Sequence, residues 1–495
     1  MKRILILVLA AAMFLSTAAV SSADGIDVKV QGQWDFAFGW AINDAFRNNV
    51  NRKSPRDNDD FIARQRIRTQ VNFITSEYLQ GVLAFEIGTQ DWGRGGSSGR
   101  GSGGALDADG VNIETRRAYL DWIIPNTEIS VRMGIQGIKL PSGPMGSPMW
   151  DADVAGIVVS SPITDWLSAT VFWVRPFDAY YNDTESGTNR HLDDEVDLFA
   201  LLLPMSGDGW AFTPWGIWGS VGSASGMYDY LFFNAYPPNT VDSENSRATA
   251  WWGGAHFELS LFDPLIFNID GAYGRINQNN LHGFQNLGAI GNWGTKGWYI
   301  GATLDYKLDW ATPGLFGWYA SGDKESDVDD GWLGRLPALG ADGGAFHPTS
   351  FGFGGSTTVG VGTDSLIATT GSGHWGIGLQ LKDFSFIEDL SHTIRVAYYR
   401  GTNDEDVIRN FGSINRGFMR YAAHDQMYLT KKDSVWEVNF DHQYKIYENL
   451  TMVVELGWLR LDSDEDVWGR AWTRTGGNKE HSNAWKAQVM FKYEF

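Results

Sequence analysis

The sequence contains no cysteine in its 495 residues. Disulfide bonds, zinc–thiolate sites and cysteine nucleophiles are therefore excluded, so an exported chain of this kind needs another source of stability. After residue 23 there is no run of about 18 apolar residues, so no transmembrane helix is predicted. Basic residues are also few, 39 against 59 acidic ones, which argues against a nucleic-acid partner.

The first 23 residues have the three-part pattern of a secretory signal peptide. Lys2 and Arg3 precede an apolar stretch at 4–15, and small residues follow up to Ala23. The apolar stretch is too short to span a bilayer, which disfavours an N-terminal membrane anchor. We therefore expect a signal peptide at 1–23 and a mature chain over 24–495, whose formal charge changes from −20 to −22 because two basic residues are lost.

Segments of strand length in which apolar and polar residues alternate recur along the chain, separated by clusters of Gly, Asp and Asn. In 484–495, for example, Trp485 and Phe491 fall on one face, and Lys486 and Gln488 fall on the other. A soluble protein with such an apolar face at a sheet edge would aggregate, whereas a membrane barrel places this face against lipid. The pattern predicts one large all-β domain over 24–495.

Short and long connections alternate between these segments. Residues 75–80 and 125–127 form short connections, whereas 43–60 and 92–112 are long and polar. This alternation is typical of a transmembrane antiparallel β-barrel with short periplasmic turns and long extracellular loops. A barrel of 16 to 18 strands encloses a water-filled lumen.

We expect about 18 strands. The alternative is 16, because the segment at 156–163 is short and the stretch 323–371 is too long for an ordinary loop, so that it hides a hairpin or folds inward. The expected strands are 28–40, 61–73, 82–89, 114–122, 128–136, 156–163, 166–175, 196–205, 210–221, 247–262, 265–276, 296–310, 314–322, 372–386, 391–401, 431–446, 450–461 and 482–495.

Arginines recur on the polar faces of three early strands. Arg64, Arg66 and Arg68 share one face at a spacing of two, and Arg117 and Arg132 lie on the polar faces of later strands. Three arginines at this spacing cannot all face lipid. We expect them on the wall of the lumen, where they either select ions or form a solvated wall without a selective role.

Tryptophan is abundant, with 23 residues, and permits two interpretations. Trp34, Trp40, Trp298, Trp436 and Trp485 fall on apolar faces near strand ends, which is typical of an aromatic girdle at the membrane interface. The alternative is sugar binding, either in a sugar-selective porin with lumen aromatics or in a secreted glycan-binding β protein. The candidates for lumen or loop positions are Trp150, Trp252 and Trp332.

Catalytic motifs are weak. Gly95 to Gly99 matches a nucleophile elbow, but it lies in a Gly/Ser-rich loop without the helix that this motif requires. No Ser/His/acid set of the kind found in an outer-membrane lipase is evident, so we expect no enzyme activity and no cofactor. Acidic outer loops at 191–195, 323–330, 404–406 and 462–466 favour one hypothesis, that divalent cations bridge them to one another or to lipopolysaccharide phosphates.

The alternating strands and the ending Phe491-Lys492-Tyr493-Glu494-Phe495 resemble Gram-negative outer-membrane porins, and the chain is similar to the homotrimeric porins described from sulfate-reducing bacteria. The resemblance implies a homotrimer in the outer membrane, in contact with lipid and lipopolysaccharide. Such a protein passes ions and small hydrophilic solutes by passive diffusion. The resemblance also implies that the barrel-assembly machinery reads Phe491, Tyr493 and Phe495.

Trimeric porins fold their third outer loop into the barrel, where acidic groups face a ladder of arginines. By this resemblance, the loop at 139–155 is the candidate constriction loop, and its Asp151 and Asp153 face the arginines across the lumen. Opposed charges of this kind produce a transverse field that sorts ions. The expected constriction residues are Arg64, Arg66, Arg68, Arg117, Arg132, Asp151 and Asp153.

Overall fold

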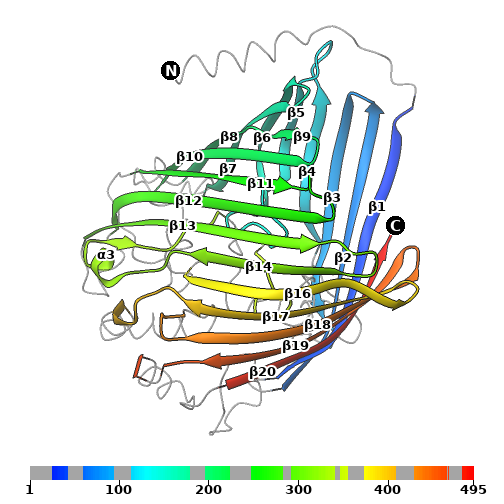
Figure 1. Cartoon of the computed structure of the whole chain (residues 1–495). Helices are drawn as coiled ribbons and strands as arrows, with labels where there is room; N and C mark the ends of the chain where they lie inside the picture. The colour runs from blue at the N-terminus through cyan, green and yellow to red at the C-terminus, as the bar shows by residue number, and fades with distance from the viewer. Residues whose placement is uncertain are drawn as a thin grey trace.

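The computed structural model describes residues 25–42, 59–93, 113–178, 195–222, 247–281, 291–339, 346–354, 373–407, 429–464, 466–467 and 482–495. These residues form a closed antiparallel β-barrel (Figure 1). The predicted signal peptide at 1–23 and the Gly/Ser-rich motif at 95–99 lie outside them, as does nearly all of the acidic stretch 191–195. None of the helices in the described part of the chain has the length and hydropathy needed to cross a bilayer.

The wall strands follow one another in chain order, and β1 pairs with both β2 and β20 to close the barrel. The elements are β1 (Asp27–Ile42), β2 (Asp59–Ser76), β3 (Leu79–Asp91), β4 (Ile113–Ile123), β5 (Ser130–Lys139), β6 (Asp151–Thr164), β7 (Leu167–Asp178), β8 (Glu195–Leu202), β9 (Met205–Gly207), β10 (Trp210–Val221), β11 (Ala248–Leu259), β12 (Leu265–Leu281), β13 (Gly291–Tyr306), β14 (Thr312–Ala320), α3 (Glu325–Asp329), β15 (Trp332–Leu333), β16 (His374–Ile387), β17 (Leu390–Gly401), β18 (Ser434–Tyr447), β19 (Leu450–Asp462) and β20 (Ser482–Glu494).

The barrel has 18 wall strands because the two short elements β9 and β15 are not separate wall strands. Strands β8 and β9 both pair with β7 and β10, so together they form one interrupted wall strand. Strand β15 is not a wall strand. It pairs in parallel with the beginning of β13, before the part of β13 that pairs with β14. The predicted number of 18 strands is confirmed, and the alternative of 16 is wrong. The segment expected as a short strand at 156–163 is the full-length β6, which already begins at Asp151.

The end of the chain closes the barrel. Phe495 N–H donates to the Gly32 carbonyl at 3.1 Å, and Gly32 N–H donates to the Phe495 carbonyl at 2.9 Å. A Cβ at residue 32 would lie only 2.6 Å from Phe495 Cζ, so glycine leaves the space that this ring occupies. The closing role predicted for the last strand is therefore confirmed by the pairing of β20 with β1.

The two faces of the wall differ in polarity. On β1, Trp34 and Trp40 are 40% and 52% exposed on the outside, whereas Asp35 and Ala37 on the lumen side are 2% and 1% exposed. Every tryptophan predicted for the aromatic girdle is exposed on this outer face, namely Trp34, Trp40, Trp298, Trp436 and Trp485. Because a closed barrel pairs its backbone groups internally, such an apolar outer face can stand in lipid.

Candidate pore constriction

A first inward segment, residues 140–150, connects β5 to β6. Gly143 N–H donates to Asp270 Oδ1 of β12 at 3.3 Å, although β12 neighbours neither β5 nor β6. Leu140, Met149 and Trp150 of this segment are each 1% exposed. The predicted loop 139–155 thus consists of an inward connection and the strand ends on both sides of it.

Arginines line the lumen side of β2, and each pairs with an acid on a neighbouring strand. Arg68 Nε donates to Glu86 Oε2 at 2.6 Å, and Arg66 Nη2 lies 3.6 Å from Asp35 Oδ2. Both side chains of the second pair are buried, at 6% and 3% exposed. The three pairs that follow this strand are Arg64–Asp91, Arg66–Asp35 and Arg68–Glu86.

Asp153 lies on the same wall as the arginines and not across the lumen from them. Arg116 Nε and Arg117 Nε donate to its two carboxylate oxygens at 2.6 and 2.8 Å. Asp151 pairs with Lys139 of the adjacent strand at 3.6 Å. The prediction that Asp151 and Asp153 face the arginines from an inward loop is therefore wrong, because both residues belong to strand β6.

Sequence reasoning missed Arg116. Strict alternation places consecutive residues on opposite faces, yet the pairing of β3 with β4 shifts register between Ala84 and Phe85. Such a bulge turns two consecutive side chains to one face, which brings Arg116 and Arg117 to the same aspartate. Adjacent arginines inside a strand were the available signal.

The predicted Arg132 completes this part of the wall. Its Nη2 donates to Asp121 Oδ2 at 2.6 Å, and its Cζ lies 4.7 Å from the centre of the Tyr119 ring. We call these residues the arginine wall. It contains six arginines and five carboxylates, an excess of one positive charge: Arg64, Arg66, Arg68, Arg116, Arg117 and Arg132 with Asp35, Glu86, Asp91, Asp121 and Asp153.

Acidic residues on β12 and β13 face the lumen about half-way round the barrel from β2. Asp270 and Asp305 are 6% and 4% exposed. Asp305 accepts from Lys382 Nζ at 2.9 Å and from Gln380 Nε2 at 3.0 Å. Asp270 accepts from Gly143 of the first inward segment and has no ion pair within the described residues. The acids opposite the arginine wall therefore lie on barrel strands and not on an inward loop. The sequence analysis did not identify them.

A second inward segment lies between β14 and β16. Its described parts are 321–339 and 346–354, and all of these residues except 321 and 322 lie in the stretch 323–371 that was expected to hide a hairpin or fold inward. At one end Trp252 Nε1 of β11 donates to the Pro337 carbonyl at 2.9 Å. At the other end Ser350 contacts β18 and β20. The segment thus reaches from the wall at β11 to the wall at β18–β20.

Glu437 of β18 holds the second inward segment. Its carboxylate accepts from Thr349 Oγ1 at 2.9 Å, from Phe351 N–H at 3.1 Å and from Gly352 N–H at 3.0 Å. Tyr399 Oη of β17 donates to it at 2.8 Å. Glu437 is fully buried, and these donors satisfy a charge that would otherwise be costly to bury.

A buried ion pair anchors the same segment from the next strands. Lys486 Nζ of β20 donates to Glu455 Oε2 at 2.7 Å and to the Ser350 carbonyl at 2.7 Å. Both charged side chains are 1% exposed, and Gln488 Nε2 donates to Glu455 Oε2 at 2.6 Å. Removal of either partner of such a buried ion pair strongly destabilises the fold, because the other charge stays buried without a counter-charge. The sequence pattern placed Lys486 on the polar face of its strand, but it did not indicate a contact with Ser350.

Aromatic rings pack the second inward segment against wall strand β14. Phe346 and Phe353 of the second inward segment lie 5.5 and 5.4 Å from Trp318 of β14 in edge-to-face contacts. Gly376 and Gly378 of β16 provide room, because a Cβ at residue 376 would lie 2.3 Å from the Trp318 ring. The inward segments are therefore packed against the wall, and they reduce the open cross-section of the lumen.

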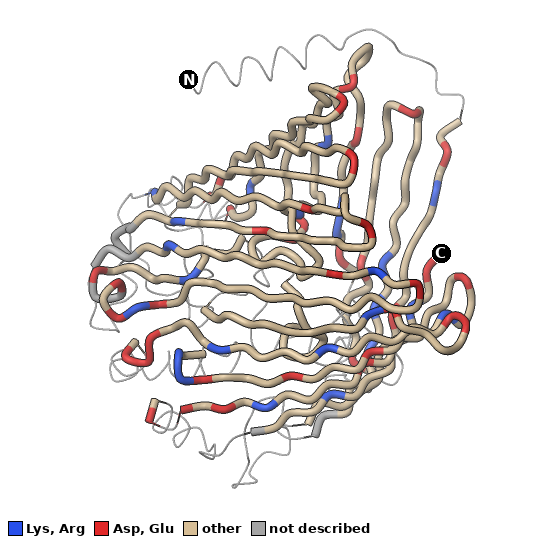
Figure 2. Tube along the Cα trace, in the orientation of Figure 1, with Lys and Arg blue, Asp and Glu red and all other residues tan. Residues whose placement is uncertain are grey.

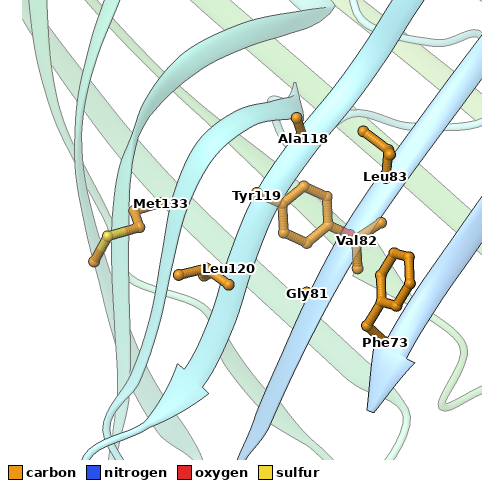
Figure 3. Close-up of a pocket in the computed structure, with 8 residues that line it drawn as sticks. All are labelled: Phe73, Gly81, Val82, Leu83, Ala118, Tyr119, Leu120 and Met133. Carbon is orange, nitrogen blue, oxygen red and sulfur yellow. The ribbon is translucent and has the colours of Figure 1, made fainter. Parts of the chain in front are cut away.

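An apolar hollow of about 350 Å³ lies elsewhere on the wall, over β2 to β5 (Figure 3). Gly81 leaves it open between Phe73 and Leu120, which are 41% and 49% exposed on the outer face. The hollow thus belongs to the lipid-facing surface and not to the passage. Its lining residues are Phe73, Gly81, Val82, Leu83, Ala118, Tyr119, Leu120 and Met133.

The acidic loops show no metal-binding arrangement in the described residues, where no group of three His, Asp or Glu side chains is placed to hold an ion. Asp323 pairs with Arg335 at 3.1 Å, and Asp404 pairs with Lys431. Figure 2 shows that charged residues gather at many of the turns and strand ends of the barrel. Part of the acidic charge predicted for the outer loops is therefore neutralised within the protein.

A closed 18-stranded barrel with an apolar outer face, a charged lumen wall and inward connections is the architecture of an outer-membrane porin. Barrels of this architecture stand in the outer membrane of Gram-negative bacteria, which is the location predicted for this chain.

Comparison with known proteins gives a likeness in structure only. No protein-family model matches the sequence, and no curated protein matches it. The chain is similar to OccAB1 of Acinetobacter baumannii, with a TM-score of 0.52 and 11% identity over 96% of this chain and 99% of that one. OpdQ of Pseudomonas aeruginosa gives a TM-score of 0.49 and 10% identity over 95% and 98% of the two chains. The likeness to OccAB1 supports the fold, and the roles of individual residues rest on the geometry above.

Proposed function

We propose that the protein is a water-filled channel for the passive diffusion of ions and small hydrophilic solutes across the outer membrane. The observation that carries this proposal is the charged lumen, in which the arginine wall lies opposite Asp270 and Asp305. A lumen filled only for stability would not need ionisable side chains on two opposed walls. Charges in a narrow aqueous passage orient and sort the solutes that pass through it.

The charges of the arginine wall and of Asp270, which face each other across the lumen, nearly cancel. The arginine wall has an excess of only one positive charge, and Asp270 on the opposite side carries one negative charge when it is ionised. We therefore expect weak ion selectivity, in which the geometry of the narrow region limits solute size more than charge does.

Replacing Arg64, Arg66 and Arg68 together with alanine is expected to make the channel more selective for cations. The substitutions change the arginine wall from one excess positive charge to two excess negative charges, because Asp35, Glu86 and Asp91 remain. The reversal potential in a salt gradient across a planar bilayer measures this change.

The matched control neutralises the partner acids. Asp35→Asn, Glu86→Gln and Asp91→Asn together are expected to shift the reversal potential in the opposite direction, towards anions. If the arginine variant folds and keeps the wild-type reversal potential, the arginine wall does not lie in the conducting passage.

The sugar-binding alternatives receive no support from the tryptophans. Trp150 and Trp252 are 1% and 2% exposed, because Trp150 of the first inward segment packs against Phe172 of β7 and Trp252 contacts Pro337 of the second inward segment. Trp332 is half-buried between two basic side chains. A sugar-selective porin needs aromatic rings that solutes can reach, and a secreted glycan-binding protein would not need the apolar outer face.

The proposal includes the partners expected from the resemblance to porins. We propose a homotrimer, similar to those of sulfate-reducing bacteria, with lipid and lipopolysaccharide around it. We also propose that the barrel-assembly machinery reads Phe491, Tyr493 and Phe495. In support, Tyr493 and Phe495 are each 41% exposed at the end of the closing strand, and their rings stack at 5.8 Å.

We further propose that divalent cations bridge the acidic outer loops to one another or to lipopolysaccharide phosphates. Carboxylate oxygens are the ligands that such hard cations prefer. Asp464 lies in one of these loops, and the acidic residue Asp466, two positions further along, is exposed. Chelation is then expected to lower the thermal stability of the protein in lipopolysaccharide-containing membranes.

A further inference from the structure

Two basic side chains lie directly opposite each other on the outer face of β12 and β13. Arg275 and Lys296 are cross-strand partners in the register of these strands. Like charges in this position repel each other, and neither residue makes an ion pair within the described part of the chain. Arg275 Nε is also buried without a hydrogen-bond partner among the described residues. Among the described residues the pair therefore has no counter-anion.

The ring of Trp332 holds the two cations together. Arg275 Cζ lies 4.6 Å from the ring centre, and Lys296 Nζ lies 4.8 Å from it. Trp332 belongs to β15, which pairs with Gly294 and Thr295 of β13. Cation–π contacts of this kind orient the guanidinium and ammonium groups without neutralising them. We call Arg275, Lys296 and Trp332 the basic clamp.

The basic clamp lies next to the aromatic girdle at the extracellular end, from which the long connections leave. The next outer-face pair on the same strands is Tyr273 and Trp298. Trp298 is 42% exposed and stacks on Tyr319 at 4.9 Å. Further down β13, Ile300 and Leu304 are 43% and 39% exposed. An apolar surface, aromatic rings and two cations thus follow one another along the outer face.

This order matches the layers of an outer-leaflet lipid. Aromatic rings of a girdle mark the depth of the headgroups, and apolar side chains below them contact acyl chains. Basic side chains just above the rings reach the depth at which anionic headgroups stand. Figure 2 shows basic residues towards the extracellular ends of these strands.

We propose that the basic clamp binds a phosphate group of an outer-leaflet glycolipid, lipopolysaccharide, whose acyl chains lie along Trp298 and Ile300. The phosphate supplies the missing counter-anion, and the contact is direct, without a bridging metal ion. The inference rests on the proposed place of the barrel in the outer membrane and is independent of what passes through the lumen. Because Trp332 comes from the second inward segment, the bound lipid also fixes one end of that segment.

Binding of bisphosphorylated lipid A to the folded full-length protein in detergent micelles tests the proposal. The double variant Arg275→Ala/Lys296→Ala is expected to bind about 30-fold more weakly, which corresponds to about 1 kcal/mol for each basic residue near an anionic headgroup. Fully dephosphorylated lipid A is expected to bind the wild-type protein as weakly as the double variant binds the bisphosphorylated form. Inorganic phosphate alone is expected to compete only at much higher concentration, because it lacks the acyl chains.

The matched control removes two positive charges at the opposite end of the strands. Lys307→Ala/Lys445→Ala, at exposed positions next to periplasmic turns, is expected to bind lipid A as the wild-type protein does. Heat-modifiable migration on a denaturing gel shows that each variant is folded. If the alanine variant does not fold, Arg275→Gln/Lys296→Gln keeps part of each side chain and takes its place.

Three results would overturn the proposal. They are equal binding of lipid A by the folded double variant and the wild-type protein, equal binding of dephosphorylated and bisphosphorylated lipid A, and competition by inorganic phosphate at the concentration at which lipid A binds. Conductance is recorded on the same preparations. A protein that conducts without binding lipid A contradicts only the basic clamp, whereas one that binds lipid A without conducting contradicts only the channel.

Discussion

Replacing Glu437 with alanine is expected to raise the single-channel conductance severalfold. The carboxylate of Glu437 accepts hydrogen bonds from Thr349, Phe351 and Gly352 of the second inward segment. Each buried donor left without an acceptor costs about 1–3 kcal/mol, so this part of the segment detaches from the wall and the passage widens. The step size of single-channel currents in a planar bilayer measures the effect.

The matched control for this variant is Glu258→Ala. Glu258 lies half-buried on β11, and no hydrogen bond or ion pair joins it to the described residues of the two inward segments. Its replacement is expected to leave the step size close to that of the wild-type channel. A folded Glu437→Ala protein with the wild-type step size would show that the second inward segment does not limit conduction.

The substitution Lys486→Met is expected to destabilise the barrel by about 3–5 kcal/mol, because it leaves a buried carboxylate without its cation. Lys486 and Glu455 are each 1% exposed, and Lys486 also donates to the Ser350 carbonyl. The loss therefore affects the wall and the inward segment together. Unfolding in urea, followed by the heat-modifiable shift on a gel, measures the change in the free energy of unfolding.

The double variant Lys486→Met/Glu455→Gln separates the buried charge from simple loss of packing. It is expected to recover most of the lost stability, since no charge remains unpaired and Gln488 still hydrogen-bonds to residue 455. If the double variant is as unstable as Lys486→Met, the destabilisation comes from packing and the ion pair is not the anchor.

The barrel could be predicted from the sequence because its wall follows a period of two. Trp34 and Trp40 were expected outside, and they are exposed there. Trp436 and Val438 alternate with Glu437 and Asn439, and the structure places the first two outside and the last two in the buried lumen face. Alternation of this kind specifies which face each strand turns to lipid, and the lengths of the connections specify which end is extracellular.

The constriction could not be predicted in the same way, because its contacts join residues that are distant in the chain. Ser350 meets Lys486, and Gly143 meets Asp270, and no local pattern connects either pair. The bulge that turns Arg116 to the side of Arg117 breaks the alternation on which the prediction relied. Strand alternation alone therefore identified the charged faces but not the partners of their charges.

The second inward segment connects the interior of the barrel with its outer surface. Thr349 to Gly352 are held by the lumen wall, whereas Trp332 of the same connection contacts Arg275 and Lys296 on the outer face. A change at either end thus acts on one continuous stretch of chain. We expect the lipid bound outside and the anchor at Glu437 inside to contribute to the same narrow passage.

Single-channel recording of the wild-type protein in a planar bilayer under a salt gradient tests the central claim most directly. We expect discrete current steps and a reversal potential close to zero, because the charges of the arginine wall and of Asp270 nearly cancel. The absence of current steps from protein that is shown to be folded and inserted would contradict the claim that this barrel is a channel.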